Sequence, residues 1–327
     1  MFQRIMLILF ISSELSYYLL IAQTGIVESY GSNIYAIALL PIGGVIGSFL
    51  SIYLKLTNNK KILIFLLLQL FASSYYPSLS HIMLFILGIS VGALAPLVIN
   101  SLKKATYTDI GIILAISYTV GVSLFNYDPF QRLWLALILT SLALIGSQFV
   151  SKMDLNKNIK QYRSSALFSL FTMVLWIFLD SALFETLSRD EAISIWRGGY
   201  SIQIIIFHII GIIMAFNIKI DKNHKELFII MLFALSYLAY FLQEGYILSI
   251  IYPFVISYYN VVILQTLVQE EFKAIAFSMV FIGWIGSGAG LFIALHGLIV
   301  FIPILFLIGF FKIIATQNTH IKEVKYV

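Results

Sequence analysis

The sequence has no cysteine and few charged residues, and these absences exclude several classes of protein. Without cysteine there is no disulfide bond, no thiolate metal ligand and no cysteine nucleophile. Charged residues form only 11% of the 327 residues, whereas a typical soluble domain has about 25%. The sequence also lacks a GxxxxGK[ST] phosphate-binding loop and an HExxH zinc motif. We therefore expect no metal, no cofactor and no enzyme activity.

Apolar residues dominate instead, at 61% of the chain with a mean hydropathy of +0.98. No water-soluble core of this size could bury so much apolar surface, so lipid must surround most of it. Lipid offers no hydrogen-bond partner to the backbone, which leaves helices or a closed barrel. Barrel strands alternate apolar and polar residues, whereas residues 61–70 read KILIFLLLQL without that alternation. The sequence predicts an all-α membrane protein.

A spanning helix needs about 20 mostly apolar residues, and the chain predicts about twelve such helices, although ten or eleven remain possible. The longest polar interval, residues 151–163, separates two groups of six. We therefore expect two pseudo-symmetric six-helix halves, residues 1–150 and 164–327, joined by a cytoplasmic loop at 151–163. The predicted spans are 5–25, 34–54, 62–76, 81–100, 109–126, 132–150, 165–186, 198–218, 227–243, 246–268, 274–294 and 297–316.

The basic residues favour one side of this arrangement. Seventeen of the 20 Lys and Arg residues fall on the side of the two termini and of the central loop, and only Arg132, Arg189 and Arg197 do not. Because cytoplasmic loops are enriched in Lys and Arg, we expect both termini to be cytoplasmic and the protein to lie in a bacterial inner membrane. This placement also explains the net charge of +5 without a nucleic-acid partner. We expect a monomer in the lipid bilayer.

The two predicted halves resemble each other in sequence. Three separate matches between the halves have nearly the same offset in residue number, which chance similarity between apolar segments does not readily produce. The matches are the segments that begin at Gly47 and Gly211 (offset 164), residues 114–125 and 281–292 (offset 167), and Glu14 and Asp180 (offset 166). Paired six-helix halves are a transporter architecture, with the substrate site at the repeat interface near the middle of the bilayer.

This layout resembles the major facilitator superfamily of secondary transporters over nearly the whole chain. That family carries a signature between its second and third helices: a glycine, an Asp-Arg pair, another glycine and a basic pair. Gly47, Lys60 and Lys61 are in place, whereas Thr57 and Asn58 stand near the expected acidic and basic pair. The first copy of the motif is therefore degraded.

A second copy of the signature, in the second half, retains more of its chemistry. It contains Asp221, Lys222, His224 and Lys225, and residues 273–290 look like the family's basic residue followed by a glycine-rich eleventh helix. The resemblance implies a secondary active transporter that moves a small organic solute by alternating access and is coupled to protons.

Two carboxyl side chains are predicted near the middle of the bilayer. Glu14 lies about ten residues into the first predicted span, or roughly 15 Å along it, and Asp180 takes the related place in the seventh. Burying a carboxylate is costly, and we expect no basic side chain to pair with Glu14. We predict that Glu14 and Asp180 carry protons; the alternative is a neutral acid bonded to a neighbouring helix. Glu185 lies on another face and is either functional or a solvated helix end.

Aromatic and polar side chains within the spans are candidates for the wall of a solute cavity. Gln203 and His208 could bind solute or relay protons, or they could form interhelical hydrogen bonds that hold the bundle together. The substrate-cavity candidates are Tyr18, Tyr118, Gln203, His208, Asn260 and Trp284.

Three glycine pairs with GxxxG spacing indicate close helix packing rather than ligand binding. They are Gly43/Gly47, Gly88/Gly92 and Gly286/Gly290.

Two other functions remain open from the sequence. A membrane-embedded enzyme acting on lipid-linked substrates would need polar residues clustered at one membrane face, and here they lie at mid-depth. A non-transporting receptor or scaffold derived from a transporter stays possible because the first signature motif is degraded.

Overall fold

The computed structural model describes residues 1–30, 34–150, 153, 168–190, 192–307 and 310. Within these residues the chain is all-helical and contains no strand, so the predicted fold class is confirmed. The predicted central loop 151–163 lies outside the described residues except for Met153, as does the end of the twelfth predicted span.

The first half opens with one long continuous helix. Part of its second half is a π-helix, with a wider turn than the α-helical parts on either side. The elements are α1 (Phe2–Tyr17), the π-helix η1 (Tyr18–Gly25), α2 (Ile26–Ser29), α3 (Ile34–Ile37), α4 (Leu39–Tyr53), α5 (Asn58–Ser73), α6 (His81–Ser101), the 3-10 helix η2 (Leu102–Lys104), α7 (Tyr107–Leu124), the 3-10 helix η3 (Pro129–Gln131) and α8 (Leu133–Val150).

The second half contains a second π-helix, in its fifth long helix. The elements are α10 (Leu170–Arg189), α11 (Ser201–Asn217), α12 (Lys222–Phe241), α13 (Gly245–Leu267), α14 (Phe272–Met279), the π-helix η4 (Val280–Gly286), α15 (Ser287–Leu295) and the 3-10 helix η5 (Leu298–Phe301), which leads into an apolar helix ending at Leu307 among the described residues.

Nine helices in the described part of the chain are long and apolar enough to cross a membrane. Three shorter ones complete the predicted series of about twelve: α5, α11 and the apolar helix Leu298–Leu307. Most observed bounds lie within about four residues of the predicted ones, the usual uncertainty of such boundaries.

Polar side chains fix where several of these helices begin. Thr106 and Asp109 form a reciprocal capping box at the start of α7, which satisfies backbone N–H groups that the helix itself leaves unpaired. Ser80 and Ser169 accept hydrogen bonds from Met83 N and Thr172 N at the starts of α6 and α10. Such caps matter in a membrane protein because few other donors and acceptors are available there.

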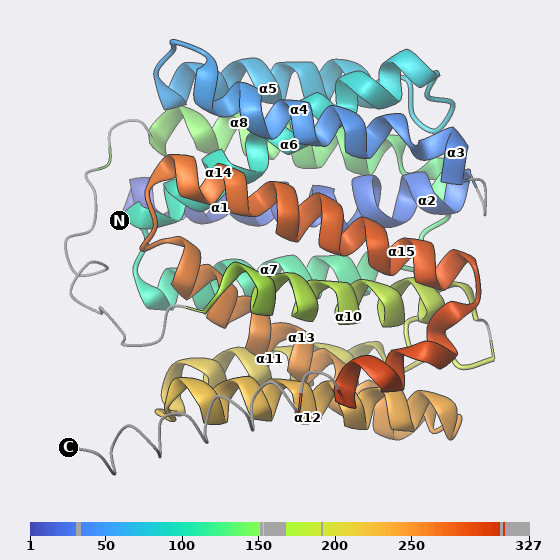
Figure 1. Cartoon of the computed structure of the whole chain (residues 1–327). Coiled ribbons are helices and arrows are strands. Elements are labelled where there is room, and N and C mark those ends of the chain that lie inside the picture. Colours follow the sequence, from blue (N-terminus) through green and yellow to red (C-terminus); the bar gives the residue numbers. More distant parts are fainter. Residues whose placement is uncertain (31–33, 151–152, 154–167, 191, 308–309, 311–327) are drawn as a thin grey trace.

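The helices lie side by side in one bundle, and the two halves repeat the same neighbours (Figure 1). In the first half α4 packs on α6 and α1 on α7; in the second α11 packs on α13 and α10 on α15. The matched glycines take part: a Cβ at Gly47 would lie 2.1 Å from the Ile89 carbonyl oxygen on α6, and one at Gly211 would lie 2.5 Å from the Phe254 carbonyl oxygen on α13.

Basic residues gather at one end of the bundle, which we call the basic end. There Arg4 forms an ion pair with Asp109, and Lys61 Nζ donates to the Ser51 carbonyl oxygen at 2.6 Å. The opposite end, called the arginine end, holds Arg132, Arg189 and Arg197. This separation follows the predicted distribution of charge.

Candidate functional site: a cavity between the two halves

A cavity of about 270 Å³ lies among helices from both halves. Its walls come from α1, η1, α6 and α7 of the first half and from α10, the segment before α11, α11, α13, α14, η4 and α15 of the second. Seven of the eight residues predicted as site candidates line it: Glu14, Tyr18, Tyr118, Asp180, His208, Asn260 and Trp284. The fold thus brings together side chains that are far apart in the sequence.

Glu14 is buried, with 5% of its surface exposed, and its partner is an amide rather than a base. Gln69 Nε2 of α5 donates to Glu14 Oε2 at 3.0 Å and to Thr140 Oγ1 of α8 at 3.2 Å. Gln69 Oε1 is buried and has no hydrogen-bond partner among the described residues. The local network therefore retains one unused acceptor close to the carboxyl group.

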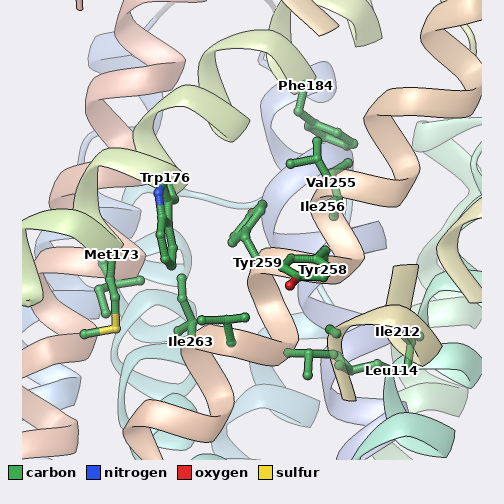
Figure 2. Close-up of a cluster of buried hydrophobic side chains, with 14 of the residues drawn as sticks. Leu114, Met173, Trp176, Phe184, Ile212, Val255, Ile256, Tyr258, Tyr259 and Ile263 are labelled. Atoms are coloured by element: carbon green, nitrogen blue, oxygen red, sulfur yellow. The ribbon is translucent and has the colours of Figure 1, made fainter. Parts of the chain in front are cut away.

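Asp180 is held by two tyrosine hydroxyls from α13. Tyr252 donates to Asp180 Oδ1 at 2.8 Å and Tyr259 donates to Oδ2 at 2.7 Å. Figure 2 shows Tyr259 within the buried cluster that also contains Trp176 of α10, with ring centroids 6.5 Å apart. Both carboxylate oxygens thus have a neutral donor, and the side chain remains partly accessible from the cavity.

Three cavity residues join α7, α11 and α13 across the interface between the halves. The Tyr118 ring stacks on His208, with centroids 4.2 Å apart and planes 5° from parallel. Asn260 Nδ2 donates to the Tyr118 hydroxyl at 2.9 Å. His208 Nδ1 lies 2.7 Å from Ser257 Oγ. The Trp196 ring is nearly parallel to the His208 ring, and their centroids are 6.5 Å apart. Tyr118 is therefore bound to the second half through both its ring and its hydroxyl.

Tyr18 and Trp284 enter the cavity from the two π-helices, η1 and η4. A π-turn leaves backbone carbonyls poorly paired, and π-turns are frequent at functional sites. In η1 this need is met by Arg132, whose Nη1 donates to both the Leu20 carbonyl oxygen and Thr24 Oγ1 at 2.9 Å. The Arg132 side chain is fully buried and so helps position the segment that presents Tyr18.

Gln203, predicted as a cavity residue, is not among the residues that line the cavity. Gln203 Nε2 donates to Ser249 Oγ at 2.6 Å and to the Tyr246 carbonyl oxygen at 3.2 Å, which ties α11 to α13. The reason is angular: five residues separate Gln203 from His208, or about 500° of helix rotation, so the two point to different faces. Its role is the interhelical hydrogen bond considered as the alternative.

Glu185 is not a solvated helix end, because only 3% of its surface is exposed. It lies one and a half turns beyond Asp180, and its Oε2 is 3.6 Å from Arg189 Nη2. The same angular argument places it outside the cavity wall.

Comparison with known proteins identifies the fold. No protein-family model matches the sequence, and no curated protein matches it either. A solved structure that does match is the human organic anion transporter MFSD10 (TETRAN), with a TM-score of 0.59 and 15% identity over 95% of this chain and 98% of that chain. The chain has the major facilitator fold.

Two further major facilitator structures agree. The transporter FucP in its outward conformation matches with a TM-score of 0.56 and 12% identity, over 94% of this chain and 97% of that chain. The proton:xylose symporter XylE, bound to 6-bromo-6-deoxy-D-glucose, matches with a TM-score of 0.53 and 13% identity, over 94% of this chain and 90% of that chain. The resemblance drawn from the sequence is thus confirmed as a major facilitator fold.

Sequence reasoning missed several residues that build this major facilitator cavity. Gln69 and Thr140 are polar residues within apolar helices, a signal that could have marked them as partners of Glu14. Arg132 follows a loop, so its charge gave no hint that it folds back onto η1. Trp196 precedes α11 in a segment without regular periodicity, yet it lines the cavity.

Proposed function

We propose that this protein is a secondary active transporter of a small organic solute that works by alternating access and couples transport to protons. The observation that carries the proposal is the cavity between the halves, into which Glu14 and Asp180 project from corresponding helices, α1 and α10. Residues 1–150 and 164–327 would be the two moving bodies. A site at the interface between two repeats, near the middle of the bilayer, is where alternating-access transporters bind their substrate.

The hydrogen-bond partners of both acids can accommodate a proton. Tyrosine hydroxyls donate to a carboxylate and can also accept from a carboxylic acid, so Tyr252 and Tyr259 can serve either form of Asp180. The Gln69 amide can donate to ionised Glu14 or, after a flip, accept from the protonated acid. A basic partner would instead hold the carboxylate in its charged form. These pairs therefore favour reversible protonation.

Polar contacts join the halves at both ends of the bundle, as expected of a transporter that opens one end at a time. At the arginine end Arg197 Nη2 lies 3.5 Å from Glu28 Oε1, and Asn126 Nδ2 donates to the Trp196 carbonyl oxygen at 3.2 Å. At the basic end Lys103 Nζ donates to the Glu270 carbonyl oxygen at 2.6 Å. Each set is small enough to break while the other persists.

The direct test is solute-dependent proton movement in proteoliposomes that contain a pH-sensitive dye. A panel of organic cations, organic anions and sugars is added outside, and internal pH is followed. We expect at least one class to change the internal pH in wild-type vesicles. Glu14→Gln keeps the size and hydrogen bonding of the side chain but cannot titrate, so it should abolish the pH change while counterflow of labelled solute continues.

The matched control is Glu244→Gln, which removes an exposed carboxylate in the turn between α12 and α13. It should retain the wild-type response. A pH change that survives in the double variant Glu14→Gln/Asp180→Asn would refute proton coupling at these residues. The absence of solute movement for every class would refute transport.

The enzyme alternative requires polar residues clustered at one membrane face. Here Glu14 and Asp180 lie well inside their helices and line one cavity between the two halves, which favours transport over catalysis on a lipid-linked substrate.

A further inference from the structure

The described lining of the cavity contains two acidic side chains and no Lys or Arg. The two carboxyl groups are those of Glu14 and Asp180. His208 is the single histidine in that lining, and it is buried against Ser257. An anionic solute would meet two acids and lose its hydration without gaining a counter-charge, which is strongly unfavourable in an apolar site.

The nearby arginines do not alter this balance because each has another partner. Arg132 binds backbone carbonyl oxygens, including that of Phe125 at 2.6 Å. Arg197 pairs with Glu28 at the arginine end. Neither guanidinium belongs to the cavity wall.

Aromatic rings and aliphatic side chains form most of the remaining wall. The rings come from both halves: Tyr18, Tyr118, Phe125, Phe184, Trp196, Tyr259 and Trp284. A cation over the face of Trp or Tyr is attracted by the ring quadrupole, and the attraction increases when water is excluded. Leucine and isoleucine side chains between the rings provide contact surface for an apolar body.

The two acids differ in how readily they can meet a solute. Glu14 is 5% exposed and bonded to Gln69 behind the wall. Asp180 is partly accessible. Asn260 of α13 lines the same cavity, and because its Nδ2 donates to Tyr118, its Oδ1 is the atom that can accept a hydrogen bond from a solute. Asp180 and Asn260 together offer oxygens suited to an ammonium group.

We infer that the cavity binds an organic cation with an apolar or aromatic body, and that the positive charge lies against Asp180. This inference rests on the proposed transport function and names its substrate class. It differs from the sugar and organic anion named for the matching structures. A solute cation would occupy Asp180, which leaves Glu14 as the carboxyl group that carries the coupled proton.

The test compares three ligands of different charge on the purified protein. The probes are benzyltrimethylammonium as a permanent aromatic cation, phenylacetate as an aromatic anion and fucose as a neutral sugar. Binding is followed by quenching of tryptophan fluorescence, because Trp196 and Trp284 line the cavity. We expect saturable binding of the cation and at least about tenfold weaker binding of the other two.

Two variants test the site itself. Asp180→Asn keeps the shape of the side chain and can still bond to Tyr252 and Tyr259, so the fold should persist, as checked by thermal unfolding. It should weaken cation binding about tenfold or more. Glu244→Gln removes an exposed carboxylate that is not part of the cavity lining, so it should leave the affinity unchanged.

The outcomes separate this inference from the proposed function. Equal or tighter binding of phenylacetate or fucose, no saturable cation binding at millimolar concentration, or an unchanged affinity in Asp180→Asn would overturn the inference. The dye assay could still show proton-coupled transport of another class in those cases. Cation binding at Asp180 without any proton or solute flux would support the inference that the cavity binds an organic cation and would refute transport.

Discussion

Replacing Gly92 by alanine tests the packing on which the first half depends. Gly92 lies on α6 where that helix crosses α4. A Cβ at this position would lie 2.0 Å from the Gly44 carbonyl oxygen and 2.6 Å from the Gly44 Cα. Ordinary C···O contacts in proteins are about 3.3–3.6 Å, so the two backbones would have to separate by about 1.3 Å.

No side-chain rotation can relieve this clash, since the opposing atoms belong to the backbone. The same seam contains Gly88, whose added Cβ would lie 2.1 Å from the Leu40 carbonyl oxygen, so any separation spreads along the two helices. Overpacking of this kind costs about 1–3 kcal/mol, and we expect the upper part of that range. The greater helix propensity of alanine, about 1 kcal/mol, offsets only part of it.

The assay is thermal unfolding in detergent, with Gly288→Ala as the control. Gly288 also lies within a helix, α15, but a Cβ there would meet no atom within 4 Å. That variant should keep or slightly raise the unfolding midpoint, whereas Gly92→Ala should lower it by roughly 2–4 °C for each kcal/mol lost. If both variants unfold at the wild-type temperature, the close α4–α6 contact does not contribute to stability as argued.

Two further predictions concern orientation and the support of η1. Reporter fusions after Lys157 and after Ser188 should report opposite sides of the membrane, with the former cytoplasmic; the same side for both would contradict the topology. Arg132→Gln should lower the unfolding midpoint, because each buried carbonyl left without a donor costs about 1–3 kcal/mol, and Arg132→Lys should fall between it and wild type. Equal midpoints for all three proteins would show that Arg132 does not support η1.

The architecture could be predicted from sequence because it depends on features that are local in the sequence. Membrane spans depend on about 20 consecutive apolar residues, and side preference depends on local Lys and Arg content. The internal repeat supplied the division into halves, and the matched glycines Gly47 and Gly211 do contact corresponding helices. The π-helices could not be predicted, because neither η1 nor η4 contains a proline, and the glycines in them (Gly25, Gly283 and Gly286) do not distinguish a π-turn from an α-turn.

The cavity was predictable only in part, because its lining depends on helix rotation as well as depth. Depth alone selected Glu14, Asp180 and His208, and the structure brings all three to the cavity. Depth also selected Gln203, whose rotation on α11 turns it toward α13 instead. Partners such as Gln69 required knowledge of which helices pack together, which a single sequence does not contain.

Glu14 and Asp180 occupy corresponding places in the two halves, yet their surroundings suit them to different tasks. The amide of Gln69 reaches Glu14 from behind the wall, and that carboxyl is almost fully covered. Asp180 receives two phenolic hydroxyls and is accessible to a solute. A covered acid can exchange a proton but cannot hold a solute, whereas an accessible acid can hold either. Under the proposed function, the repeat therefore supplies two equivalent positions, and the neighbouring helices would assign proton binding to one of them and solute binding to the other.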